Sequence, residues 1–173
     1  MKSSFIIALV IFVACNAIRF IYELLKKDGK INPQSTPLFI FILLVMCILW
    51  LSWFAMCPQD PLRLILPDNI RWIGLGIFIA GLILAFGALI QLRGVENINH
   101  LETQWLFSKL RHPMYLGFIF WILGWVIFYG AVLSFFAGLI CIGNIIYWRY
   151  LEEEHLAGIY GDKYLTYRKQ TWF

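Results

Sequence analysis

Charged residues are scarce in this sequence. Only 14% of the 173 residues are Asp, Glu, Lys or Arg, whereas 61% are hydrophobic and the mean hydropathy is +0.76. This balance excludes an ordinary soluble domain and predicts a polytopic membrane protein with an all-α fold. The membrane spans occupy most of the length, so we expect no separate soluble catalytic domain.

Motifs for metal binding, disulfide bonding and phosphate binding are also absent. The four cysteines (residues 15, 47, 57 and 141) lie in or beside apolar segments, with no CxxC spacing and no neighbouring His. We therefore interpret them as packing residues, and we expect no metal. The glycines between residues 74 and 87 belong to an apolar run, which predicts close helix packing and not a phosphate loop.

The apolar runs predict about five transmembrane helices. The first three runs cover residues 5–22, 38–57 and 72–92. Residues 114–147 then contain no Asp, Glu, Lys, Arg or His. One helix over this stretch would be on the order of 54 Å long, whereas a bilayer core is about 30 Å thick. We therefore expect a hairpin of two spans, with a break at residues 129–131, where Gly130 weakens the helix.

The basic residues are distributed unevenly between the two sides of this predicted bundle. Only three of the 14 lie on the side of the N-terminus: Lys2, Arg63 and Arg71. The others lie on the opposite side, and such an excess is typical of cytoplasmic loops. We expect the N-terminus outside and the C-terminus in the cytoplasm. The net charge of +4 thus fits membrane orientation, and we expect no nucleic-acid partner.

Two polar stretches flank the predicted hairpin. RHPMYLG at residues 111–117 precedes it, and WRYLEEEHLAGIYG at residues 148–161 follows it. Because two crossings return the chain to its starting side, these stretches should meet at the cytoplasmic face. The meeting residues would be His112, Tyr115, Arg149, Glu152 and Glu153. Anchoring of the helix ends by these charges and aromatic rings is the alternative interpretation.

The order and spacing of these stretches resemble the integral-membrane methyltransferases of the isoprenylcysteine carboxyl methyltransferase and phospholipid methyltransferase group. The resemblance covers roughly residues 92–167 and includes EExxLxxxYGxxYxxY at residues 152–167. It implies a single membrane domain over residues 1–173, with scaffold spans in 1–91 and a cofactor-binding and catalytic half in 92–173. It also implies S-adenosylmethionine as cofactor and a membrane-embedded or apolar methyl acceptor.

The resemblance also implies roles for individual residues. The family's RHPxY element matches residues 111–115, so His112, Pro113, Met114 and Tyr115 would bind the cofactor. The paired acids of the family match Glu152 and Glu153.

A further family element, His-x-Leu-Val-Thr-x-Gly-x-Tyr, precedes RHP. It corresponds to HLETQWLF at residues 100–107, aligned with a gap of one residue, and Trp105 takes the place of the glycine. His100, Leu101 and Phe107 are the expected cofactor contacts of this element.

The residue types fit the chemistry of this cofactor. Glu152 can accept hydrogen bonds from a ribose or an amino group, and His112 with nearby backbone N–H groups can bind a carboxylate. Pro113 predicts a helix start, which leaves N–H groups of the first turn unpaired. We expect catalytic roles for Arg149 and Glu152, with Arg149 binding an anionic group of the acceptor. A buried ion pair between Arg149 and a glutamate is the simpler alternative.

Two other functions stay open at this point. One is a reductase of the sterol-reductase type that uses NADPH, although the paired glutamates and the few basic residues near Arg111 argue against it. The other is a membrane subunit without enzymatic activity. The acceptor group can be a carboxylate, an amine or a thiol.

Overall fold

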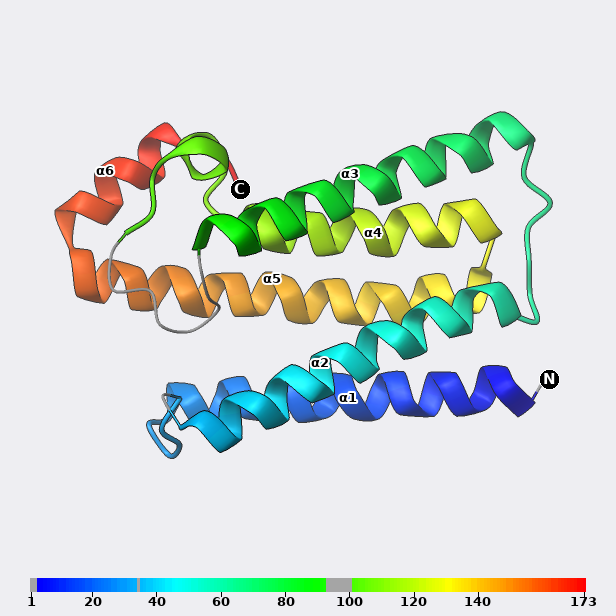
Figure 1. Cartoon of the computed structure of the whole chain (residues 1–173), viewed down its shortest axis with the longest axis horizontal. Helices are drawn as coiled ribbons and strands as arrows, with labels where there is room; N and C mark the ends of the chain where they lie inside the picture. Colours follow the sequence, from blue (N-terminus) through cyan, green and yellow to red (C-terminus); the bar gives the residue numbers. More distant parts are fainter. Residues whose placement is uncertain (1–2, 34, 93–100) are drawn as a thin grey trace.

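The computed structural model describes residues 3–33, 35–92 and 101–173, and these ranges are almost entirely helical (Figure 1). They contain isolated bridges but no β-strand, which confirms the all-α prediction. The long helices are α1 (Ser3–Lys27), α2 (Thr36–Met56), α3 (Asp68–Leu92), α4 (Pro113–Tyr129) and α5 (Val132–Tyr160). A short helix, α6 (Asp162–Gln170), follows α5, and two 3-10 turns are η1 (Cys57–Gln59) and η2 (Trp105–Ser108).

Four of these helices, α1, α2, α3 and α5, are long and apolar enough to cross a membrane. The fifth, α4, is apolar but has only 17 residues, so its length is about 26 Å at 1.5 Å per residue. This is close to the thickness of a bilayer core. The predicted polytopic membrane protein is therefore confirmed, with α4 as the shortest of its apolar helices.

The break between α4 and α5 lies where the sequence predicts it. Gly130 follows the last residue of α4 and has a φ of 63°, the left-handed conformation that glycine adopts at little cost. A Cβ atom at Gly130 would also lie 2.3 Å from the carbonyl oxygen of Leu64. Gly130 therefore permits both the tight turn and the close approach of the α2–α3 connection.

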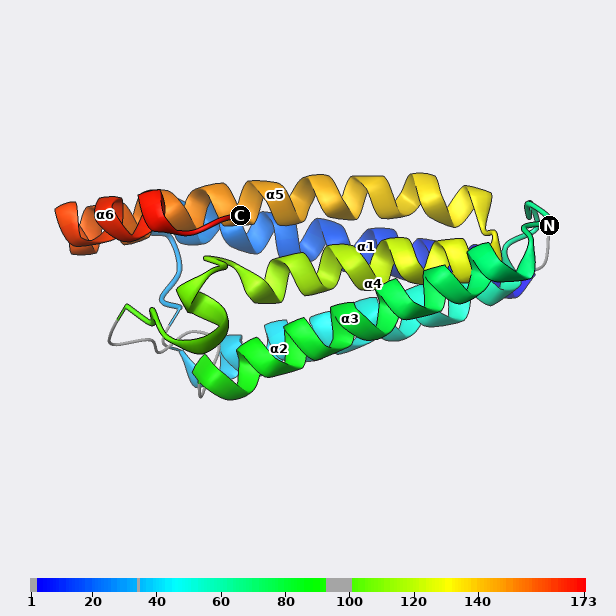
Figure 2. The same ribbon diagram turned by 90° about the horizontal axis from the view of Figure 1, so that it is seen from above.

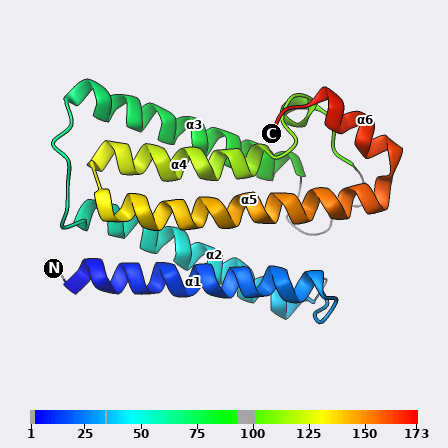
Figure 3. The ribbon, with the colours of Figure 1, turned by 180° about the vertical axis from the view of Figure 1, so that it is seen from behind.

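The five long helices form two pairs with α5 between them. In Figures 1 and 3, α5 runs between α4 and α1, and α2 crosses α1 at an angle. The α3–α4 pair is the most tightly packed, because small residues allow the two backbones to touch. A Cβ atom at Gly81 would lie 2.6 Å from the carbonyl oxygen of Gly117. The predicted role of the α3 glycines in helix packing is thus visible at Gly81.

The two chain ends lie at opposite ends of the bundle (Figures 1 and 2). The C-terminal end of the bundle also contains the start of α4, the last turns of α5, the turn η2 and the helix α6. At the other end, the buried carboxylate of Asp60 accepts two 2.7 Å hydrogen bonds from Ser134, in the first turn of α5. The polar stretches that flank the hairpin are therefore gathered at one end of the molecule.

The four cysteines are free thiols, and Cys15, Cys57 and Cys141 are buried in the apolar core while Cys47 is exposed. The three buried cysteines agree with the interpretation as packing residues, whereas the exposed Cys47 does not. Within residues 3–33, 35–92 and 101–173, no group of three or more metal-ligating side chains is found.

Candidate active site

The site begins with the sharp entry of the chain into α4. His112 precedes the helix with φ −127° and ψ 59°, and Pro113 is the first helical residue, as the sequence predicts. No side chain caps this helix, so the N–H groups of Met114 and Tyr115 have no partner within the first turn. His112 itself is buried, with 5% of its surface exposed.

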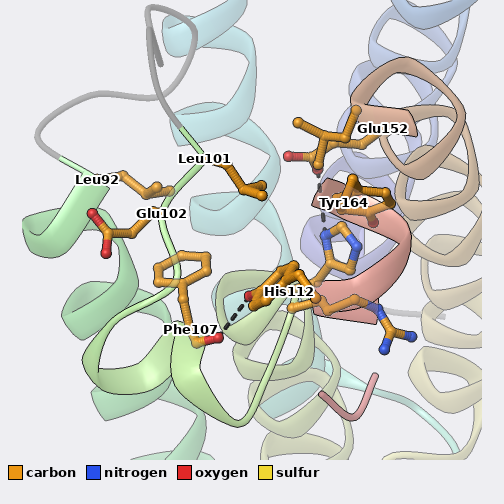
Figure 4. A pocket seen from close by; sticks show the side chains of 10 residues that line it. Leu92, Leu101, Glu102, Phe107, His112, Glu152 and Tyr164 are labelled. Atoms are coloured by element: carbon orange, nitrogen blue, oxygen red, sulfur yellow. Dashed lines mark hydrogen bonds and ion pairs between the residues drawn. The ribbon is translucent and has the colours of Figure 1, made fainter. Parts of the chain in front are cut away.

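Two glutamates of α5 face the His112 imidazole. Its Nδ1 lies 3.6 Å from Oε2 of Glu152, and its Nε2 lies 3.4 Å from Oε1 of Glu153. Figure 4 shows His112 and Glu152 pointing toward one another from the two arms of the hairpin. The structure thus brings together the RHP and EE stretches that the two-span topology placed on one side.

The glutamates also determine the charge of His112. Burial alone would lower the pKa of its imidazole, but the interactions with Glu152 and Glu153 outweigh burial and raise the pKa above the ordinary value of 6.5. The two glutamates therefore favour the protonated form of His112. A cationic side chain at this position suits a carboxylate ligand.

Glu153 is the centre of an ion-pair network. Its carboxylate lies 3.1 Å from Nε of Arg111, 3.6 Å from Nε of Arg149 and 3.5 Å from Nε of Arg168. Its side chain is 7% exposed, whereas that of Glu152 is 37% exposed. Glu153 therefore holds protein groups together, and Glu152 is the glutamate that remains accessible to a ligand.

The last residues of the chain lie against the RHP stretch. Arg111 donates from its backbone N–H to the carbonyl of Trp172 at 3.1 Å, and His112 donates to that of Phe173 at 3.2 Å. The Arg111 guanidinium also donates to the carbonyl oxygens of Arg168 and Thr171. The guanidinium carbon of Arg149 lies over the ring of Phe173, 4.8 Å from the ring centre. This segment therefore fixes the position of the polypeptide just before α4.

His112 also lines a pocket (Figure 4). It holds about 420 Å³ of empty space, a volume that includes space open to solvent. The end of α3, the segment before α4, α5 and α6 all contribute to its walls. The lining residues are Leu92, Leu101, Glu102, Phe107, Arg111, His112, Glu152, Leu156, Tyr164 and Tyr167.

Two polar atoms of the pocket walls are buried without a hydrogen-bond partner in the described part of the chain. They are the hydroxyl of Tyr164 and Nε2 of His112, which faces Glu153 without forming a hydrogen bond. Burial raises the pKa of the Tyr164 hydroxyl, so this group stays protonated. His112 Nε2 already has the Glu153 carboxylate beside it. Because buried polar atoms are normally hydrogen-bonded, the Tyr164 hydroxyl indicates a polar ligand in this pocket.

The neighbouring Tyr167 has a different role. Its hydroxyl donates a 2.6 Å hydrogen bond to the carbonyl of Phe107, which connects α6 to the turn η2. Trp105, which stands in place of the family's glycine, has a φ of 48° in this turn. Trp105 therefore adopts a left-handed backbone conformation, which is common for glycine but rare for other residues.

The expected site residues divide into two groups. Leu101, Phe107, His112 and Glu152 line the pocket. The other expected site residues that the structure describes do not line the pocket. Pro113 is fully buried, Met114 is half-buried, and the Tyr115 ring is stacked on that of His112 with 5.6 Å between the ring centres. Arg149 and Glu153 belong to the ion-pair network. His100 lies outside the described residues.

Several lining residues were not among the expected site residues. Tyr164 and Tyr167 are the YxxY part of the motif at residues 152–167, so their spacing of three was a usable signal. Leu156 lies one helical turn after Glu152 and shares its face. Leu92 and Glu102, in contrast, have no sequence pattern that connects them to the site.

An α-helical membrane bundle with a small-molecule pocket at one end is the class of protein defined by this fold and site. The family model of phospholipid methyltransferases matches residues 70–163, more than half of the chain. The chain therefore belongs to the phospholipid methyltransferase family.

A relative and the solved structures complete the comparison. The chain is 30% identical over 82 residues to protein-S-isoprenylcysteine O-methyltransferase of Schizosaccharomyces pombe. The aligned region is 43% of this chain and 33% of that protein, so the chain spans about a third of the length of this curated relative. No solved structure matches the chain.

Proposed function

We propose that the protein transfers a methyl group from S-adenosylmethionine to an apolar acceptor in the membrane, with the pocket at His112 and Glu152 as the cofactor site. The observation that carries this proposal is the buried Tyr164 hydroxyl, which has no hydrogen-bond partner in the described part of the chain, in a pocket that His112 and Glu152 also line. Membership of a methyltransferase family supports the reaction type.

The pocket residues fit the groups of this cofactor. Glu152 can accept hydrogen bonds from hydroxyl or amino groups, and protonated His112 with the free N–H groups of the first turn of α4 can hold a carboxylate. Tyr164 can donate from its hydroxyl. The apolar side chains Leu92, Leu101 and Leu156 can cover a flat apolar ring and exclude water.

When bound, the cofactor supplies an electrophilic methyl group on a sulfonium. The protein's part in such an in-line displacement is to orient the two reactants and to exclude water. We assign this role to Glu152 on the cofactor side. Arg149, in contact with Glu153 and Phe173, is proposed to act on the acceptor side.

The name of the yeast relative favours a carboxylate as the acceptor group, because that enzyme is an O-methyltransferase of isoprenylcysteine. The family name favours a phospholipid. Both acceptors are apolar molecules that reside in membranes. We further propose that the pocket faces the cytoplasm, because most basic residues lie at the C-terminal end of the bundle.

Ligand titrations of the purified protein in detergent test the proposal. S-adenosylhomocysteine should raise the thermal midpoint in a concentration-dependent manner, whereas NADPH should not. Stabilisation by NADPH alone would identify a reductase, and stabilisation by neither ligand would favour a non-enzymatic subunit. Incubation of membrane extracts with methyl-labelled S-adenosylmethionine would then identify the molecule that becomes labelled.

A further inference from the structure

Helix α1 lies outside the region matched by the family model, yet it carries polar residues along one face. Asn16, Arg19 and Glu23 are spaced three and four residues apart, so they share this face. Asn16 and Glu23 are 5% and 8% exposed, and the Arg19 side chain is 12% exposed. Polar side chains buried inside a membrane bundle are costly and commonly serve a function.

This polar face of α1 packs on α5. Arg19 forms an ion pair with Glu23, and its guanidinium carbon lies 4.8 Å from the ring centre of Trp148. Asn144 donates a 3.4 Å hydrogen bond to Asn16. Trp148 precedes Glu152 by one helical turn. Arg19 is therefore placed about one turn from the glutamate that lines the pocket.

Tyr115 connects the polar face of α1 with the proposed cofactor site. Its ring is stacked on that of His112, with an interplanar angle of 17°, and the charges of Glu152, Arg19 and Glu23 all act on its hydroxyl. Among the described residues, none that lines the pocket belongs to α1. The polar face of α1 thus approaches the Tyr115–Glu152 pair from outside the pocket.

Arg19 has an unused donor. One of its terminal nitrogens bonds Glu23, but its Nε is buried without a hydrogen-bond partner in the described part of the chain. A guanidinium has five N–H donors and is suited to bidentate binding of carboxylates and phosphates. Arg19 also lies over the rings of Tyr22 and Trp148, as Arg149 lies over that of Phe173. The free donor of Arg19 therefore indicates an anionic ligand within the membrane bundle.

We infer that Arg19, oriented by Glu23, binds the anionic group of an apolar methyl acceptor. The inference rests on the proposed methyltransferase function and adds a specificity-determining residue from α1. The ligand chemistry is a carboxylate or a phosphate attached to a long apolar chain. A prenylcysteine carboxylate and a phospholipid headgroup both present it, and either can reach α1 from the lipid.

Binding of defined probes in detergent micelles tests the inference directly. The two probes carry an anionic group, which is the carboxylate of N-acetyl-S-farnesylcysteine or the phosphate of phosphatidylethanolamine. Their uncharged controls lack it: N-acetyl-S-farnesylcysteine methyl ester and diacylglycerol. The wild type should bind one anionic probe more tightly than its control, and the probe that is preferred distinguishes carboxylate from phosphate. Arg19→Gln should weaken that binding about tenfold or more, as expected for loss of a charge-assisted bond. Arg19→Lys should retain part of it.

A purely structural role of the Arg19–Glu23 pair requires a separate control. The double variant Arg19→Met/Glu23→Leu removes both charges, so it leaves no unpaired charge in the bundle. It should bind S-adenosylhomocysteine within about twofold of the wild type, because no described residue that lines the pocket belongs to α1, and should still lose the preference for the anionic probe. Wild-type preference in this variant would overturn the inference.

Arg149→Gln is the matched comparison, since Arg149 is the other arginine proposed to act on the acceptor. Loss of anion preference in Arg149→Gln but not in Arg19→Gln would assign the anion to Arg149 and overturn the inference. Equal binding of anionic and uncharged probes by the wild type would overturn it as well. Failure of the wild type to bind S-adenosylhomocysteine is a different result, because it would remove the proposed function itself.

Discussion

Nε2 of His112 lies 3.4 Å from Oε1 of Glu153, so the start of α4 meets the last turns of α5 through two buried side chains. Three arginines surround the same carboxylate. The negative charge of Glu153 is therefore shared among several cations, and the position of the imidazole is fixed. His112 can then present its other nitrogen toward Glu152 and the pocket.

This contact predicts a pH dependence of stability. The pKa of His112 is raised in the folded protein, so protonated His112 stabilises the fold. This stabilisation is fully present below the ordinary pKa of 6.5 and is lost as pH rises through the higher folded pKa. We expect the thermal midpoint of the wild type to fall over this window relative to that of His112→Gln. Thermal unfolding in detergent from pH 5.5 to 9 measures it. A constant difference between the two proteins would contradict the role assigned to the Glu152 and Glu153 charges.

The accessible glutamate of α5 predicts a difference between two neighbouring positions. Glu152 lines the pocket, whereas Glu154 is exposed and accepts a 2.6 Å hydrogen bond from Tyr150. Glu152→Gln should weaken binding of S-adenosylhomocysteine by about 10- to 100-fold, corresponding to roughly 1.5–3 kcal/mol for a charge-assisted hydrogen bond. Glu154→Gln should change it little. Isothermal titration of both variants compares them, and equal losses would show that Glu152 does not bind the ligand.

The arrangement of chain ends predicts the membrane topology. Helix α1 begins at one end of the bundle and α6 lies at the other, and the sequence predicts most basic residues on the side of the C-terminus. Reporter fusions that end at Asp60 and at Phe173 should therefore report opposite sides, with Phe173 in the cytoplasm. The same side for both fusions would exclude five spans. Opposite sides with Phe173 outside would keep the fold and reverse the orientation.

The sequence was sufficient for the features that depend on apolar length and on turn residues. The break at Gly130 and the start of α4 at Pro113 could be predicted because glycine permits a left-handed turn and proline fixes φ at a value that suits the first turn of a helix. The meeting of His112 with Glu152 and Glu153 followed from the antiparallel hairpin. These predictions needed no knowledge of side-chain packing.

Other parts of the site could not be predicted from local patterns. Glu152 and Glu153 are adjacent and chemically identical. Arg149 lies four residues before Glu153 in α5, but Arg111 and Arg168 reach Glu153 only because the segment before α4 and α6 pack beside α5. The approach of Arg19 to Trp148 depends on how α1 packs against α5, which no spacing within α1 specifies. Long-range contacts of this kind require the assembled bundle.

The contact between α3 and α4 predicts a packing defect. A Cβ atom at Gly117 would lie 2.6 Å from the backbone nitrogen of Ala85, whereas one at Gly76 would meet nothing within 4 Å. Gly117→Ala should therefore separate the two helices and lower the free energy of unfolding by roughly 1–3 kcal/mol. Gly76→Ala should be neutral or slightly stabilising, because alanine favours a helix. Thermal unfolding of both variants in one detergent tests this, and equal midpoints would contradict the close α3–α4 contact.

The two tyrosines of α6 provide the sharpest test of the pocket. Both line it, but Tyr167 donates to the carbonyl of Phe107, whereas the Tyr164 hydroxyl is buried without a partner in the described ranges. Tyr167→Phe should lower the stability of the ligand-free protein by about 0.5–1.5 kcal/mol, because it removes an existing hydrogen bond. Tyr164→Phe should leave that stability unchanged or slightly higher, because it removes an unsatisfied polar atom.

Bound ligand should reverse which of these two substitutions has the larger effect on stability. Tyr164→Phe should reduce the stabilisation by saturating S-adenosylhomocysteine, because the ligand supplies the missing partner of the Tyr164 hydroxyl in the wild type. Tyr167→Phe should retain most of this stabilisation. Thermal midpoints of the wild type and both variants, with and without the ligand, separate the two effects. If Tyr164→Phe destabilises the ligand-free protein and leaves the ligand's effect intact, the Tyr164 hydroxyl has a structural partner and does not contact the cofactor.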